Sequence, residues 1–89
     1  MAYQWDPAKA HSNVKRHGVD FADAVTSLED ELSLVTEDQL SEGEERFICL
    51  GRSAEGFLLV TVFCYRGDDI RIISSRHATA HERRKYEEP

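Results

Sequence analysis

The chain has 89 residues and a net charge of −6, and its residues are 40% hydrophobic and 31% charged. This length indicates one domain, residues 1–89, of ordinary globular composition. The acidic balance argues against a non-specific nucleic-acid binder, and no apolar run approaches the roughly 18 residues of a membrane span. The first residues lack the basic start and apolar stretch of a signal peptide, so we expect a cytoplasmic protein with no membrane partner.

The first third of the chain predicts a short strand and two helices. Residues 3–5 alternate as an edge strand does, and an Asp-Pro pair followed eleven residues later by glycine predicts a helix over 7–17. Asn13 and His17 lie one turn apart on it and are expected to stabilise it locally. Asp20 can cap a second helix. The apolar stripe of that helix consists of Phe21, Ala24, Val25 and Leu28.

The middle of the chain predicts four strands. Residues 32–36 form the first candidate, and a polar loop follows it. The apolar runs 46–52 and 57–65 flank a short turn, which is the pattern of a hairpin, and a second turn leads into a strand over 70–75. Run 57–65 is so continuously apolar that we expect it in the centre of the sheet. Strands joined by short turns must be antiparallel.

The strand over 70–75 passes almost directly into a predicted helix over 79–86. This helix begins with a Thr-x-x-Glu capping box. Simple alternation along the strand places Arg76 on the face of Ile72 and Arg71 on the opposite face. The fold class that follows is α+β, with an antiparallel sheet of four to five strands, two N-terminal helices and one C-terminal helix.

The cysteines and histidines do not form a metal-binding pattern. Cys49 and Cys64 both lie in apolar runs without a second ligand at close spacing, so we expect buried, reduced thiols. His77 and His81 are four residues apart but lack the glutamate that accompanies such a pair in zinc enzymes. We therefore expect neither a metal nor a cofactor.

Charge is distributed unevenly along the chain. Segment 29–45 holds eight acids and no Lys or Arg, and a solvated surface is the favoured interpretation. Segment 66–86 holds six cations against three acids, which on an acidic chain predicts either RNA binding or the docking of an acidic partner. These cations are Arg66, Arg71, Arg76, Arg83, Arg84 and Lys85.

The junction between the last strand and the last helix carries groups suited to RNA cleavage. Arg76 could hold a phosphate bidentately, and His77 beside it could transfer a proton near neutral pH. Cleavage without a metal needs a base for the 2′-hydroxyl, an acid for the leaving oxygen and cations for the transition state. The residue pattern equally allows a structural ion pair of Arg76 with Glu82 or Glu45, and a surface role for His77.

Short motifs in a fixed order run through nearly the whole chain. They are Trp5-Asp6-Pro7-x-Lys9-Ala10, Asn13, Lys15-Arg16-His17-Gly18-Val19-x-Phe21, Ala24, Glu45-Arg46, Gly51, the run 71–79 and Glu82-Arg83-Arg84-x-Tyr86. Together they resemble the signature of the BrnT toxin family. The resemblance implies a bacterial type II toxin with a RelE-like fold that cleaves RNA without a metal. It also implies inactivation by a BrnA-type antitoxin, which binds operator DNA, so that the toxin meets DNA only indirectly.

The resemblance, together with the charge pattern, defines the expected site. The expected catalytic residues are Arg76, His77, Glu82 and Tyr86. The expected RNA-binding residues are Arg46, Arg66, Arg71, Arg83 and Arg84. The alternative function is that of a non-catalytic, degenerate toxin, which keeps only the antitoxin interface and acts as a co-repressor.

Overall fold

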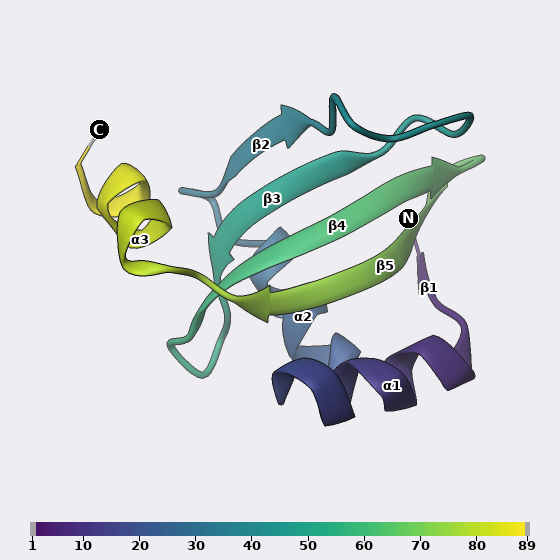
Figure 1. Ribbon diagram of the computed structural model, residues 1–89, viewed down its shortest axis with the longest axis horizontal. Coiled ribbons are helices and arrows are strands. Elements are labelled where there is room, and N and C mark those ends of the chain that lie inside the picture. Colours follow the sequence, from purple (N-terminus) through teal and green to yellow (C-terminus); the bar gives the residue numbers. More distant parts are fainter. Residues whose placement is uncertain (1, 89) are drawn as a thin grey trace.

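The computed structural model describes residues 2–88, in which five strands form one sheet and three helices pack around it (Figure 1). In chain order the elements are β1 (Tyr3–Gln4), α1 (Pro7–His17), α2 (Phe21–Leu28), β2 (Leu34–Glu37), β3 (Phe47–Arg52), β4 (Leu58–Arg66), β5 (Asp69–His77) and α3 (Ala80–Glu87). The strand order across the sheet is β1-β5-β4-β3-β2. The predicted α+β class is confirmed, and β4 is the central strand as its apolar run predicted.

Strand direction matches the prediction except at β1. Strands β2, β3, β4 and β5 are antiparallel in succession. Strand β1 pairs with β5 in parallel, with Tyr3 opposite Ile70 and Gln4 opposite Arg71. The expectation of a wholly antiparallel sheet is therefore wrong at this edge. A short turn forces antiparallel pairing only between consecutive strands, and β1 is separated from β5 by most of the chain.

The helices begin where the capping residues predicted. The side chains of Asp6 and Asp20 accept hydrogen bonds from the first turns of α1 and α2. Gly18 has a positive φ of 68° and ends α1 in the left-handed conformation that glycine adopts without strain. Thr79 and Glu82 form the predicted capping box of α3. No helix of residues 2–88 is long and apolar enough to cross a bilayer.

Strand β2 begins two residues later than expected. The Asp30 carboxylate accepts a hydrogen bond from the backbone N–H of Leu32 at 3.0 Å, which holds this part of the chain in a turn. Side chains of Asp bond backbone groups two residues on in this way and compete with strand formation. Strand β5, in contrast, continues to His77.

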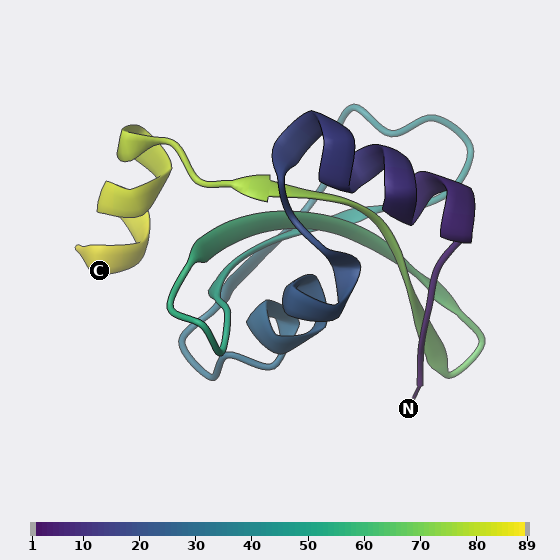
Figure 2. The same ribbon diagram turned by 90° about the horizontal axis from the view of Figure 1, so that it is seen from below.

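Helix α2 covers one face of the sheet, and α1 lies along the edge formed by β5 (Figures 1 and 2). Phe21 and Ala24 of α2 pack on Ile72, and the Trp5 ring meets Phe21 edge-on with 5.9 Å between ring centroids. At Gly51 in β3 the helix approaches so closely that a Cβ atom would lie 2.3 Å from the Ser27 carbonyl oxygen. Glycine is required there for packing.

Buried polar groups connect α2 to strands β4 and β5. The Thr61 hydroxyl lies 2.9 Å from that of Ser75 and 3.4 Å from that of Ser27, and all three side chains are buried. Both cysteines are buried and free, as predicted. Burial raises the pKa of the Cys49 and Cys64 thiols, so both stay protonated at neutral pH.

A β-bulge in β5 changes which side chains share a face. Val62 pairs with Ser74 and Phe63 with Ile72, so Ile73 is the extra residue. Paired residues share a face. Arg71, Ser74 and Arg76 therefore lie together with Cys64, Val62 and Val60, their partners in β4. The expectation from simple alternation, which placed Arg76 with Ile72, is wrong because the bulge shifts the period by one residue.

We call the sheet face opposite α2 the open face. It carries an apolar row across β2, β3 and β4, and it ends at β5 in a more polar strip. The apolar members are Leu34, Ile48, Leu50, Val60 and Val62. Helix α3 lies beyond the end of β5, as Figures 1 and 2 show, and Tyr86 from this helix packs against the cluster around Leu50 and Val60.

Asn13 joins α1 to the outer edge of β5. Its side-chain N–H groups donate to the carbonyl oxygens of Ser75, at 2.8 Å, and Val19, at 2.9 Å. Its carbonyl oxygen accepts from the Ser75 N–H at 3.1 Å. Because β1 pairs only with the start of β5, the Asn13 amide occupies the place of a neighbouring strand at Ser75. Asn13 thus stabilises the tertiary structure as well as its own helix.

We expect Asn13→Ala to lower the free energy of unfolding by about 3 kcal/mol, because it leaves buried backbone groups of β5 without partners. Chemical denaturation followed by circular dichroism measures the loss. Ser12→Ala, one residue away on an exposed position of the same helix, is the matched control and should change stability by less than about 0.5 kcal/mol. Equal stability of the two variants would contradict this role of Asn13.

Candidate functional site

The guanidinium of Arg76 is bound by Glu82. Nη1 donates to Oε1 at 2.8 Å and Nη2 donates to Oε2 at 2.9 Å, a bidentate pair between β5 and α3. Both side chains are partly exposed, at 42% and 26%. Glu82 also accepts from the Thr79 N–H at 2.9 Å. Of the pairings that the residue pattern left open, the structure contains the one with Glu82.

This pairing fixes the charge of both groups. The hydrogen bonds from Arg76 lower the pKa of the Glu82 carboxyl to about 2, and the hydrogen bond to Glu82 raises the pKa of Arg76. A carboxylate with so low a pKa is a weak base and holds no proton at neutral pH. Glu82 is therefore suited to orienting the guanidinium and poorly suited to moving protons.

Tyr86 is also engaged in a contact within the protein. Its hydroxyl donates to the Asp30 carboxylate at 2.5 Å, and the Arg52 guanidinium lies 5.3 Å from the ring centroid. The hydrogen bond to Asp30 raises the pKa of Tyr86. These contacts tie α3 to the turn before β2, so Tyr86 acts here as an anchor.

The structure places His77 apart from the Arg76–Glu82 pair. Its ring packs edge-on against Phe57, with 5.4 Å between centroids, and it lines a hollow with Val19 of the α1–α2 connection. His77 contacts Arg76 only through its backbone oxygen, which accepts from Nη1 at 3.2 Å. Neighbours in a strand point to opposite faces, which separates the two side chains.

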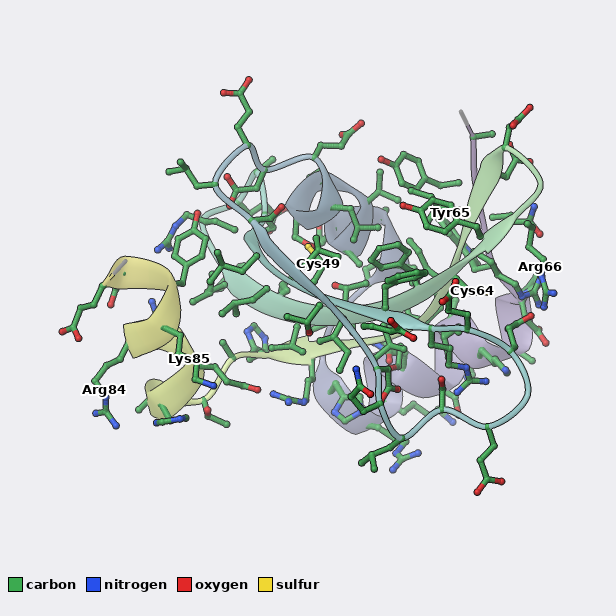
Figure 3. All side chains as sticks on the ribbon, turned by 90° about the horizontal axis from the view of Figure 1, so that it is seen from above. Cys49, Cys64, Tyr65, Arg66, Arg84 and Lys85 are labelled. Atoms are coloured by element: carbon green, nitrogen blue, oxygen red, sulfur yellow. The ribbon has the colours of Figure 1, made fainter. Side chains whose placement is uncertain are left out.

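The predicted RNA-binding arginines do not form one surface. Arg66 pairs with Glu44 at 2.6 Å, Arg71 donates to the Gln4 side chain at 3.3 Å, and Arg46 is half-buried with its Nε enclosed and unbonded. Arg83 and Arg84 are exposed on α3. Figure 3 shows Arg66 and Arg84 at opposite ends of the molecule.

The open face instead borders a groove between α1 and β5 that contains a different histidine. Two hollows, of about 310 and 260 Å³, both include His17 and Ser74. The larger one also includes Arg76 and Glu82, and the smaller one continues along α1. We call this the α1–β5 groove, and its ionisable lining residues are Lys9, Arg16, His17, Arg76 and Glu82.

Three features of the sequence build this groove. The bulge brings Ser74 and Arg76 to the open face, and Asn13 fixes α1 on the edge of β5. His17 follows Asn13 by one helical turn and is thereby carried to the same place. The sequence interpretation missed Lys9, Arg16 and His17 as site residues, although all three belong to the BrnT-like motif.

The groove combines a half-buried imidazole, a hydroxyl and an oriented guanidinium beside further cations. An imidazole can accept or return a proton near neutral pH, and a guanidinium can stabilise charge that develops on a phosphate. Within residues 2–88 no three His, Cys, Asp or Glu side chains gather into a metal-binding group. The imidazole, the hydroxyl and the guanidinium are groups suited to acid–base chemistry and to the stabilisation of negative charge.

Fold and groove together define a small α+β domain with a groove lined by a histidine and several cations. The model of the BrnT family, described as the ribonuclease toxin of type II toxin–antitoxin systems, matches residues 5–82. The chain belongs to this family. Its structure is similar to the crystal structure of the Brucella abortus ribonuclease toxin BrnT, with a TM-score of 0.70 and 24% identity over 89% of this chain and 99% of that chain. No curated protein sequence matches the chain. The expected likeness to RelE stays a prediction.

The Arg76–Glu82 pair predicts a specific loss of stability in acid. Above the unfolded-state pKa of about 4.3 Glu82 is charged in both states and the pair stabilises fully, and this contribution is lost as the pH falls toward about 2. We expect Glu82→Gln, which can keep the capping box, to show a shallower loss of stability between about pH 5 and 2 than the parent chain. At neutral pH the variant should be less stable by about 1 kcal/mol or less, because both groups are partly exposed.

Urea denaturation at a series of pH values measures this difference. Glu87→Gln is the matched control, since Glu87 is exposed on the same helix. It should leave the pH dependence of the parent chain unchanged. Identical acid slopes for the parent and Glu82→Gln would show that the pair makes no contribution.

Proposed function

We propose that the chain is an endoribonuclease toxin that cleaves RNA without a metal ion and inhibits growth in the cytoplasm. The observation that carries the proposal is the α1–β5 groove, in which His17 and Arg76 border the same hollow. Membership of the BrnT family supports the class of reaction. The overall acidity of the chain is compatible with it because the groove gathers Lys9, Arg16 and Arg76, whereas eight of the acids belong to segment 29–45.

In the proposed mechanism an RNA phosphodiester lies in the α1–β5 groove. Lys9 and Arg16 attract the backbone, and His17 accepts the proton of the 2′-hydroxyl. The 2′-oxygen attacks the phosphorus, the bond to the 5′-oxygen breaks, and that oxygen takes a proton from the His17 imidazolium or from water. Arg76, held by Glu82, stabilises the added charge on the phosphate. His77 and Tyr86 have no proton-transfer role in this proposal, because other contacts engage their side chains.

We further propose that a BrnA-type antitoxin neutralises the toxin, and that operator DNA is reached only through this partner. The toxin–antitoxin class of the family supports a protein partner. An antitoxin segment that covers the α1–β5 groove would exclude RNA from His17 and Arg76. Exposed Arg83 and Arg84 on α3 offer charges that such a segment could pair with.

A second candidate function is a non-catalytic toxin that serves as an antitoxin-binding co-repressor. The observation that favours it is that two of the expected catalytic side chains are hydrogen-bonded within the protein, Arg76 to Glu82 and Tyr86 to Asp30. In that case the groove would bind its ligand without turnover.

We expect the purified chain to cleave single-stranded RNA in the presence of EDTA, because the proposed groups transfer protons and stabilise charge without a metal. Gel analysis of a labelled RNA, with and without chelator, measures this. Activity that EDTA abolishes and a divalent ion restores would contradict the metal-independent mechanism. Absence of cleavage under both conditions would favour the co-repressor function.

The two histidines near β5 provide a sharper test of the site. We expect His17→Ala to lower the cleavage rate by a factor of about 10²–10⁴, the usual contribution of a proton-transferring group. His77→Ala is the matched control and should lower it by less than about tenfold, since its ring lies outside the groove. Melting curves of both variants show whether the fold is kept. The reverse order of the two effects would assign the role to His77.

A further inference from the structure

Strand β2 presents an apolar, uncovered edge. It is the outermost strand of the sheet on the side away from β5, and all four of its residues are exposed. Leu34 is 46% and Val35 is 53% exposed, and Leu32 just before the strand is 74% exposed. One partly exposed apolar side chain therefore stands on each face of the sheet at this edge, Leu34 on the open face and Val35 on the other.

The backbone of β2 has a defined set of outward hydrogen-bonding groups. Asp38 donates its backbone N–H to the Arg46 carbonyl oxygen at 2.8 Å, so this pair is hydrogen-bonded. Hydrogen-bonded and non-hydrogen-bonded pairs alternate along antiparallel strands. The pairs Val35–Cys49 and Glu37–Phe47 are consequently non-hydrogen-bonded, and the N–H and C=O groups of Val35 and Glu37 point outward. Among residues 2–88 no other group bonds to them.

This edge lacks several of the features that prevent pairing with another chain. Natural edge strands are protected by short length, by charged side chains, above all Lys, and by Pro, bulges or a covering segment. Strand β2 is four residues long, and its one charged residue is the acidic Glu37. The sequence of β2, Leu-Val-Thr-Glu, contains no Lys and no Pro, and the strand pairs with β3 in continuous register. An extended segment can therefore add to the sheet here through backbone hydrogen bonds.

The surrounding charge selects the kind of segment that can bind. Segment 29–45, which contains β2, holds eight acids and no Lys or Arg. Glu37 is exposed at the end of the strand, Glu31 is exposed three residues before its start, and Glu42 is exposed in the following loop. On the open face one cation, Lys85 of α3, lines a hollow with Leu34. A second copy of the chain would bring the same acids against each other and carries the same net charge of −6. Charge complementarity favours a basic partner.

We propose that β2 is a docking edge for an extended segment of a partner protein in which alternating apolar residues are flanked by Lys or Arg. The outward groups of Val35 and Glu37 would form the backbone hydrogen bonds. Apolar residues of the segment would pack beside Leu34 on the open face and beside Val35 on the other face. Strand β2 forms one edge of the sheet, and the α1–β5 groove lies toward the other edge. The proposal therefore goes beyond RNA cleavage and does not depend on it.

The test titrates synthetic peptides into the full chain by isothermal calorimetry. The probe is a capped peptide of the sequence Lys-Lys-Val-Thr-Val-Thr-Val-Lys-Lys. Two control peptides replace its lysines by glutamates or its central valine by proline. The lysine peptide should bind, with an affinity that decreases as salt is added, and both controls should bind at least about tenfold more weakly. Failure of the lysine peptide to bind at about 1 mM would overturn the proposal.

Variants of the chain locate the binding edge. Val35→Pro removes one outward N–H without touching the bonds to β3, and it should weaken binding by about tenfold or more. Glu37→Lys should weaken binding at low salt and have little effect at high salt. Val14→Thr alters a side chain of similar exposure (47%) on α1 and should bind as the parent does.

Two results would overturn the assignment. One is equal binding of the lysine peptide to the parent chain and to both β2 variants. The other is self-association of the parent chain in sedimentation that Val35→Pro abolishes, because the edge would then be occupied by a second copy. Glu37→Lys leaves the backbone intact and keeps the test decisive if Val35→Pro unfolds.

Discussion

The carboxamide of Asn13 is the contact on which the arrangement of the α1–β5 groove depends. Strand β1 covers only the first part of β5, and the rest of that edge would otherwise leave backbone groups unpaired. A side-chain amide offers the same donor and acceptor as a backbone peptide, and Asn13 bonds both the N–H and the C=O of Ser75. The same contact sets the position of α1, and with it the position of His17 at the border of the open face.

Helix α3 is held by polar contacts more than by apolar burial. None of its residues is buried, and its two clear attachments are Glu82 to Arg76 and Tyr86 to Asp30. Residues expected to perform chemistry thus also maintain the structure beside the groove. The ion pair orients the Arg76 guanidinium without neutralising the other cations of the groove, Lys9 and Arg16. Orientation of this kind is what a pre-organised phosphate site needs.

The two edges of the sheet differ in charge and in chemistry. The β5 edge is covered by α1 and borders a groove with several cations, whereas the β2 edge is open and apolar and belongs to a segment, 29–45, that holds eight acids and no Lys or Arg. A chain with a net charge of −6 can therefore present a surface for a polyanion and a separate one for a basic protein segment. The central strand β4, buried along most of its length, separates the two.

The sequence by itself determined the features that depend on neighbouring residues. Capping by Asp6, Asp20 and Thr79, the hairpin turns, the central position of β4 and the α+β class all follow from local spacing and apolar patterns. The BrnT-like motifs identified the family without any structure. The residue pattern did not settle whether Arg76 is free or paired, since a strand and a helix can place the same two residues together or apart.

Only the tertiary structure decided the parallel pairing of β1, the bulge at Ile73 and the contact of Asn13 with Ser75. These features join positions separated by more than sixty residues, or depend on strand register, which alternation within one segment does not encode. The bulge moved Arg76 to the open face, and the Asn13 contact brought His17 there as well. The site differs from the expected one because its members come from elements whose relative placement is fixed by packing and backbone hydrogen bonding across the whole sheet.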